Sequence, residues 1–147
     1  MNQEQFIQLI SGKMKLIRIE KDLTQDEAAN QLGISKKTLI QIEKGRNPAG
    51  WTVVVTFCTL YRDSELLANL LGDDPLELID LIIKNGHVIR DQQPSYSKIW
   101  WQDVKNHAAF VLQQNMISGH YRILDGDGQR IYSTFDLKEA EDYLESL

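Results

Sequence analysis

The sequence has one cysteine, Cys58, and therefore cannot form a disulfide within the chain. Its three histidines are scattered and lack the ligand spacing of a structural zinc site, so we expect no metal and no other cofactor. No apolar run approaches the roughly 18 residues that a membrane helix needs. The first residues lack a basic cluster followed by an apolar run, so we expect no secretory signal and a cytoplasmic protein.

Proline and glycine are scarce, at 3 and 9 residues, and 42% of the residues are hydrophobic. This composition excludes collagen-like and wholly disordered classes. The net charge of −5 is unevenly spread. Met1–Leu70 holds nine basic and eight acidic residues, whereas Leu71–Leu147 holds seven basic and thirteen acidic residues. We therefore expect a basic face only in the first half, and we expect the second half to repel polyanions.

Helical signals dominate the first half of the chain. Apolar residues at three- and four-residue spacing predict a helix over Gln3–Asp22, with a break at Ser11-Gly12. Cap residues, glycine stops and apolar content predict further helices over 25–32, 36–44, 51–60, 64–71 and 75–84. The polar segment His87–Ser97, which contains the last proline, is interpreted as a linker.

The second half changes its periodicity after the linker. We expect a helix over Ile99–His107 and then short strands over Phe110–Leu112, His120–Leu124 and Arg130–Thr134. Tyr121 and Ile123 alternate with His120 and Arg122, which indicates a strand with one buried face. Asp125-Gly126-Asp127-Gly128 predicts a hairpin turn, and Asp136 opens a final helix that reaches Leu147. The predicted fold class is α+β, with an all-α first half and a small antiparallel β-meander with flanking helices.

One segment carries most of the functional information. Residues 23–46 read Leu-Thr-Gln-Asp-Glu-Ala-Ala-Asn-Gln-Leu-Gly-Ile-Ser-Lys-Lys-Thr-Leu-Ile-Gln-Ile-Glu-Lys-Gly-Arg. Thr24 is the N-cap of one short helix, which stops at Gly33, and Ser35 is the N-cap of the next, which stops at Gly45. Two short capped helices joined by a tight glycine turn predict a helix-turn-helix.

This segment resembles the Xre/Cro family of phage-repressor-like DNA-binding domains, and the resemblance covers about residues 12–70. It implies a five-helix lambda-repressor-like domain whose third helix, here Lys36–Lys44, enters the DNA major groove. The domains expected on this basis are a DNA-binding domain over 1–71, a helix and linker over 72–97, and a small C-terminal domain over 98–147. Ala28 stands where the family usually has a larger apolar residue, so we expect Trp51 or Phe57 to fill that space.

The resemblance also assigns roles to individual side chains. It implies that the DNA-facing residues are Gln25 on a phosphate, Ser35, Lys36, Lys37 and Gln41 at the recognition helix, and Lys44, Arg46 and Asn47 in the loop behind it. Arg18 is implied to pair with Glu43, in a structural rather than a DNA-contacting role. Lysine can donate to guanine and Gln41 can bond adenine, but a lysine at these positions can also contact only phosphate.

The function expected from the sequence is a transcriptional regulator that binds a two-fold symmetric operator in double-stranded DNA as a homodimer, with repression the commoner outcome. The alternative is an antitoxin, or a protein-partner-binding module, built on a helix-turn-helix core. The C-terminal domain is expected to dimerise, or to take a small-molecule or protein effector. Its aromatic residues Trp100, Trp101, Phe110 and Tyr121 are candidate anchors, or else core residues. No residue pattern suggests an enzyme or a membrane partner.

Overall fold

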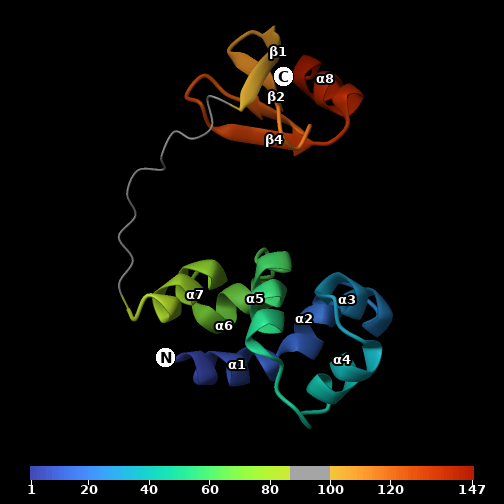
Figure 1. Cartoon of the computed structure of the whole chain (residues 1–147), viewed down its shortest axis with the longest axis vertical. Coiled ribbons are helices and arrows are strands. Elements are labelled where there is room, and N and C mark those ends of the chain that lie inside the picture. Colours follow the sequence, from blue (N-terminus) through green and yellow to red (C-terminus); the bar gives the residue numbers. More distant parts are fainter. Residues whose placement is uncertain (87–99) are drawn as a thin grey trace. The chain divides into compact units, whose positions relative to one another are not determined.

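The computed structural model describes residues 1–86 and 100–147, and the chain divides into two compact units (Figure 1). Met1–Ile89 forms a helical unit, and Arg90–Leu147 forms a sheet unit. The linker predicted over 87–97 lies outside the described residues. Among the described residues, no helix is long and apolar enough to cross a membrane.

The described part of the helical unit contains seven helices. They are α1 (Gln3–Ser11), α2 (Met14–Glu20), α3 (Gln25–Leu32), α4 (Lys36–Glu43), α5 (Trp51–Leu60), α6 (Glu65–Leu71) and α7 (Pro75–Ile83). The predicted break after α1 is confirmed, because Gly12 is the C-cap of this helix. The five helices α2 to α6 account for the predicted five-helix domain, and α1 and α7 flank it in sequence.

A single apolar core holds the helical unit together. Phe6, Ile10 and Met14 from the first two helices lie in it beside Val54 and Phe57 of α5. Ile79 of α7 belongs to the same core, so α7 is packed into this unit rather than separate from it. Ala28 is buried, and both aromatic residues expected near it join the core, Phe57 fully and Trp51 partly. Fully burying such side chains contributes about 1.5–3 kcal/mol each, which the short helices need because they are unstable alone.

The sheet unit contains four antiparallel strands in the order β1-β2-β3-β4, followed by one helix. The strands are β1 (Trp101–His107), β2 (Phe110–Asn115), β3 (Tyr121–Leu124) and β4 (Arg130–Thr134), and the helix is α8 (Leu137–Glu145). The α+β fold class is therefore confirmed, and so is the predicted hairpin turn between β3 and β4. In that turn, Asp125 Oδ1 accepts hydrogen bonds from the Asp127 and Gln129 amides, and Gly128 has φ +77°.

The helix predicted over Ile99–His107 is wrong, because its described residues from Trp101 onward form β1, and the sheet has four strands instead of three. His107 pairs with Phe110, so β1 and β2 are joined by a tight turn at Ala108-Ala109. Alanine is the strongest helix former, and the Asn-Gly or Asp-Gly turn signal is missing there. Cross-strand pairing with β2 thus overrides the local helical preference.

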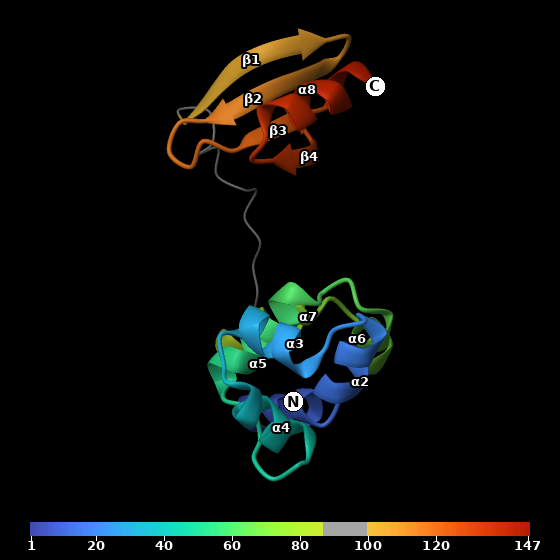
Figure 2. The same ribbon diagram turned by 90° about the vertical axis from the view of Figure 1, so that its right-hand side faces the viewer.

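The two faces of the sheet have different surroundings. Leu112 and Ile123 are fully buried against Ala140 and Leu144 of α8, and Figures 1 and 2 show α8 lying along one face of the sheet. Phe110 and Tyr121 pack on this core. Because side chains alternate along a strand, Gln113 and Arg122 lie on the opposite face. The four candidate aromatic anchors therefore do not form one cluster: Trp101 contacts Arg122, away from the core that holds Phe110 and Tyr121.

Candidate nucleic-acid interface

The motif segment folds as two short helices with a tight turn between them. Thr24 Oγ1 accepts from the Glu27 amide at 3.1 Å to start α3, and Ser35 Oγ accepts from the Thr38 amide at 3.1 Å to start α4. Gly33 ends α3 with φ +71°, a conformation that costs residues with a Cβ about 1–2 kcal/mol. The chain then reverses because the Ile34 amide donates to the Ala29 carbonyl. Figures 1 and 2 show α3 and α4 on the same flank of the helical unit.

Buried apolar residues fix the inner side of α4. Leu39 and Ile42 are buried in the same core as Ala29 and Leu32 of α3. The outer side of α4 is left to its polar residues, which is the arrangement that a groove-reading helix needs.

An ion pair fixes the far end of α4. Arg18 Nε donates to Glu43 Oε1 at 2.5 Å and Arg18 Nη2 donates to Oε2 at 3.2 Å, so the pair that the family resemblance implies is formed. Arg18 Nη1 also donates to the Leu23 carbonyl at 2.9 Å. These bonds hold α2, the start of α3 and the end of α4 in one arrangement.

Gln25 joins this network as well. Its amide nitrogen donates to Glu43 Oε2 at 2.8 Å. Burial alone would raise the pKa of the Glu43 carboxyl, but the hydrogen bonds from Arg18 and Gln25 outweigh it and hold the pKa below its ordinary value. Gln25 thus faces Glu43 with one N–H, and a second N–H of the same amide remains for a phosphate.

The two lysines at the start of α4 are exposed. Lys36 Nζ lies 3.1 Å from Asp26 Oδ2, and the two side chains are 50% and 72% exposed. Such a surface pair contributes little to stability, so Lys36 can exchange Asp26 for a phosphate at small cost. Lys37 has no ion pair among the described residues. The amides of both lysines precede the first hydrogen bonds of α4, and such free amides at a helix start suit anions.

The remaining candidate residues follow along α4 and the loop behind it. Gln41 is half-buried, and its Oε1 lies 3.5 Å from Arg46 Nη1. Lys44, Arg46 and Asn47 are exposed in the loop. Ser11 Oγ accepts from the buried Ala49 amide at 2.9 Å, which ties the end of this loop to α1. The structure therefore places six exposed candidates on α4 and its flanks: Ser35, Lys36, Lys37, Lys44, Arg46 and Asn47.

Three residues of this region were missed by sequence reasoning. Asp26 is the surface partner of Lys36, Ser11 anchors the loop, and Lys15 of α2 lies close enough to Glu43 to lower its pKa. Asp26 could have been noticed as an acidic residue in the first turn of α3. The roles of Ser11 and Lys15 arise from contacts between segments that are distant in the sequence, and no local sequence pattern predicts such contacts.

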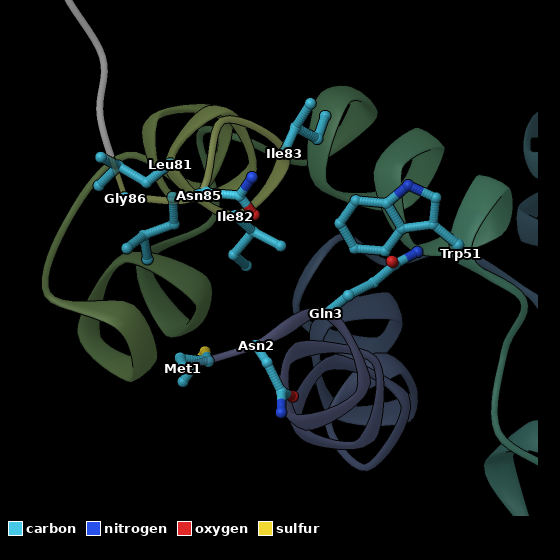
Figure 3. A pocket seen from close by; sticks show the side chains of 10 residues that line it. Met1, Asn2, Gln3, Trp51, Leu81, Ile82, Ile83, Asn85 and Gly86 are labelled. Carbon is cyan, nitrogen blue, oxygen red and sulfur yellow. The ribbon is translucent and has the colours of Figure 1, made fainter.

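A separate hollow of about 840 Å³ lies between the start of α1 and α7 (Figure 3). Its lining residues are Met1, Asn2, Gln3, Trp51, Leu78, Leu81, Ile82, Ile83, Asn85 and Gly86. None of these side chains is charged, and none belongs to α3 or α4. The hollow therefore has a mixed apolar and amide lining and lies outside the candidate interface.

Comparison with known proteins agrees with this geometry. Residues 10–71 match the sequence profile of a family described as a helix-turn-helix domain. A stretch of 37 residues is 43% identical to the cryptic phage CTXphi transcriptional repressor RstR of Vibrio cholerae. This stretch covers 25% of the present chain and 33% of that repressor. No solved structure gives a significant match.

Proposed function

We propose, from the premise that residues 10–71 are a helix-turn-helix domain, that the chain is a sequence-specific DNA-binding transcriptional regulator. In this proposal α4 enters the major groove with Lys36 and Lys37 leading. Gln41 and Ser35 face the bases or the adjacent phosphates, and Lys44, Arg46 and Asn47 contact the DNA backbone behind the helix. Gln25 contributes its remaining N–H to a phosphate on the other side of the groove.

One observation carries this proposal. The core and the Arg18–Glu43 pair fix α4 on its inner side, while Lys36 and Lys37 stand exposed at its first turn. Free amides, the positive end of the helix dipole and two lysines then lie at the same end of one helix. That combination favours a polyanion as the partner.

We further propose that the regulator acts as a homodimer and that repression is its outcome. A symmetric operator needs two recognition helices about 34 Å apart, roughly one turn of DNA. A basic face with a first-half net charge of only +1 favours two domains acting together, because each phosphate contact adds a modest, salt-dependent increment to affinity. The similarity to a phage repressor supports repression as the outcome.

The test is genome-wide capture of DNA bound to the tagged full-length protein. The expected result is a few sharp peaks that share a two-fold symmetric sequence. Lys36→Ala/Lys37→Ala is expected to abolish these peaks. The control, Lys84→Ala/Lys138→Ala, removes the same charge outside α3 and α4 and is expected to leave the peaks unchanged.

Other outcomes would contradict the proposal. The role of α4 as the DNA-contacting helix would be contradicted if the peaks persist in Lys36→Ala/Lys37→Ala. It would also be contradicted if the parent protein enriches no DNA. Stoichiometric co-purification of a partner protein without DNA enrichment would favour the partner-binding alternative. A reporter gene behind the captured sequence then measures the direction of regulation, and activation would contradict the repressor role.

A further inference from the structure

The face of the sheet turned away from α8 carries an unusual set of side chains. This open face, as it is called below, comprises Trp101, Asp103, Gln113, Arg122, Arg130 and Phe135. Asp103, Gln113 and Arg122 lie in one cross-strand row, because Asp103 pairs with Gln113 and Gln113 pairs with Arg122. Among the described residues of this unit, α8 is the one helix, and it packs on the other face.

Arg122 is the most informative residue of the open face. It is 9% exposed, its Nε donates to Gln113 Oε1 at 2.9 Å, and its guanidinium carbon lies 3.8 Å from the centre of the Trp101 ring. In the part of the chain that the structure describes, no carboxylate pairs with it. A buried cation without a counter-ion is unfavourable, and stacking on an indole offsets only part of this cost.

A second cation adds to the positive charge that lacks a counter-ion on this face. The Arg130 guanidinium lies 5.7 Å from the same Trp101 ring, and it also has no acidic partner among residues 1–86 and 100–147. Burial, and then the charge of Arg130, lower the pKa of Arg122. Two neighbouring guanidinium groups on one face therefore lack the negative charge that would stabilise both.

The open face also has an aromatic part, in which Trp101 and the neighbouring His120 are half-buried and Phe135 is exposed. The Trp101 and His120 rings lie 4.9 Å apart, the His120 and Phe135 rings lie 5.8 Å apart, and Phe135 is 78% exposed. Among its described residues, 100–147, the unit buries four apolar residues completely between its sheet and α8. So small a core leaves an antiparallel sheet marginally stable, and aromatic residues with arginine are the composition of interface centres.

The open face also carries the charge that its arginines lack. Asp103 is exposed on β1, at one edge of the sheet, and its Oδ1 accepts from Gln113 Nε2 at 2.7 Å without any ion pair among the described residues. Arg130 lies on β4, at the opposite edge. The face thus carries a carboxylate on one edge strand and an arginine anchored on the other, and a rotation of 180° about an axis parallel to the strands brings these two strands together.

We propose that the open face packs against the same face of a second copy of this chain, with Asp103 of each copy against the Arg130 guanidinium of the other. This inference rests on the proposed homodimer and assigns its contact surface. A two-fold axis between the sheets and parallel to the strands lays β1 of one copy across β4 of the other. Face-packed sheets lie about 10 Å apart, a distance that arginine side chains can span.

Other occupants fit the open face less well. Residues 100–147 hold four basic and eight acidic residues, so the unit as a whole repels nucleic acid. The acidic helix α8 of a second copy offers carboxylates, but a contact between two different surfaces does not close and leads to open-ended assemblies. When two identical faces pack together, both are covered and the assembly stops at a dimer.

The test measures the dimer dissociation constant of the full-length protein by sedimentation equilibrium, in the parent and in variants that exchange the charges of Asp103 and Arg130. The parent protein is expected to be a dimer. Asp103→Arg alone and Arg130→Asp alone are each expected to weaken dimerisation at least tenfold, because each opposes like charges. The double variant Asp103→Arg/Arg130→Asp is expected to return to within about threefold of the parent. Arg122 is left unchanged because it is buried.

The control is Asp142→Arg, which makes the same charge change on exposed α8 and is expected to leave dimerisation unaffected. Hydrogen exchange of the strand amides verifies that each variant keeps its fold. Four results would each overturn the proposed surface. The parent protein could be a monomer, or the double variant could fail to dimerise. Asp142→Arg could weaken dimerisation as much as the single variants do, or the protein could form open-ended assemblies. DNA capture through Lys36 and Lys37 tests the proposed function separately, so either inference can fail without the other.

Discussion

Arg18 of α2 and Glu43 at the end of α4 form a two-pronged ion pair across 25 positions of sequence. The two side chains are 13% and 3% exposed, so the pair is largely removed from water. The third nitrogen of the guanidinium donates to the Leu23 carbonyl, so one side chain orients three segments. Because the pair is shielded, its loss should affect stability more than the loss of an ordinary surface pair.

Replacing Arg18 by alanine is expected to lower the free energy of unfolding by about 3 kcal/mol, because Glu43 is then left buried without its cation. Urea unfolding followed by the helical circular dichroism signal measures this loss. Lys21→Ala is the control, because Lys21 pairs with the exposed Asp63 and should cost less than about 1 kcal/mol. Equal losses in both variants would show that the Arg18–Glu43 pair contributes no more than a surface contact.

The lowered pKa of Glu43 predicts a pH-dependent stability. A carboxyl whose pKa is lower in the folded state stabilises the fold fully above its unfolded pKa, near 4.5. That contribution is lost as the pH falls through 4.5 toward the lower folded value. Comparing unfolding free energies of the parent and Glu43→Gln should show a constant gap near neutral pH that narrows in acid. A gap that widens in acid would contradict the sign of the pKa shift.

Cys58 is expected to be chemically silent in the folded protein. It is fully buried in α5, and burial raises the pKa of its thiol to about 12, so the reactive thiolate is scarce at neutral pH. A thiol reagent such as DTNB should react only on the time scale of unfolding, and urea should accelerate the reaction in step with the unfolded fraction. Rapid labelling of the native protein would instead indicate an accessible thiol and contradict the burial of Cys58.

The helical unit was predictable because its signals are local. Thr24, Ser35 and Gly33 mark the ends of α3 and α4 by side-chain hydrogen bonds and by a backbone conformation that few residues adopt. The Arg18–Glu43 pair came from the family resemblance, since the 25 positions between its members leave no local pattern. The attachment of Gln25 to Glu43 was not predicted, because it depends on the packing of α2, α3 and α4 together.

The sheet unit was less predictable because its features depend on pairing between strands. Arg122 alternates with buried residues, and the pattern therefore assigned it to an open face. Its near-complete burial arises from Trp101, which lies two strands away in the sheet and which the sequence placed on a helix. The error at β1 thus concealed the stacking of Arg122 as well, and with it the arrangement of cations on this face.

The turn that misled the assignment of β1 yields its own prediction. Ala108 has φ +52°, a left-handed conformation that costs a residue with a Cβ about 1–2 kcal/mol and that asparagine tolerates better. Ala108→Asn should therefore stabilise the β1–β2 hairpin by about 1 kcal/mol, which slows hydrogen exchange of its amides by roughly fivefold. Ala109→Asn is the matched control, since Ala109 does not have a positive φ, and it should bring no such gain. If both variants slow hydrogen exchange at the hairpin, or if neither does, the backbone strain at Ala108 does not limit the stability of the hairpin. If only Ala108→Asn does, then strand pairing sustains a turn that its own sequence disfavours, which is why β1 could not be recognised from local signals.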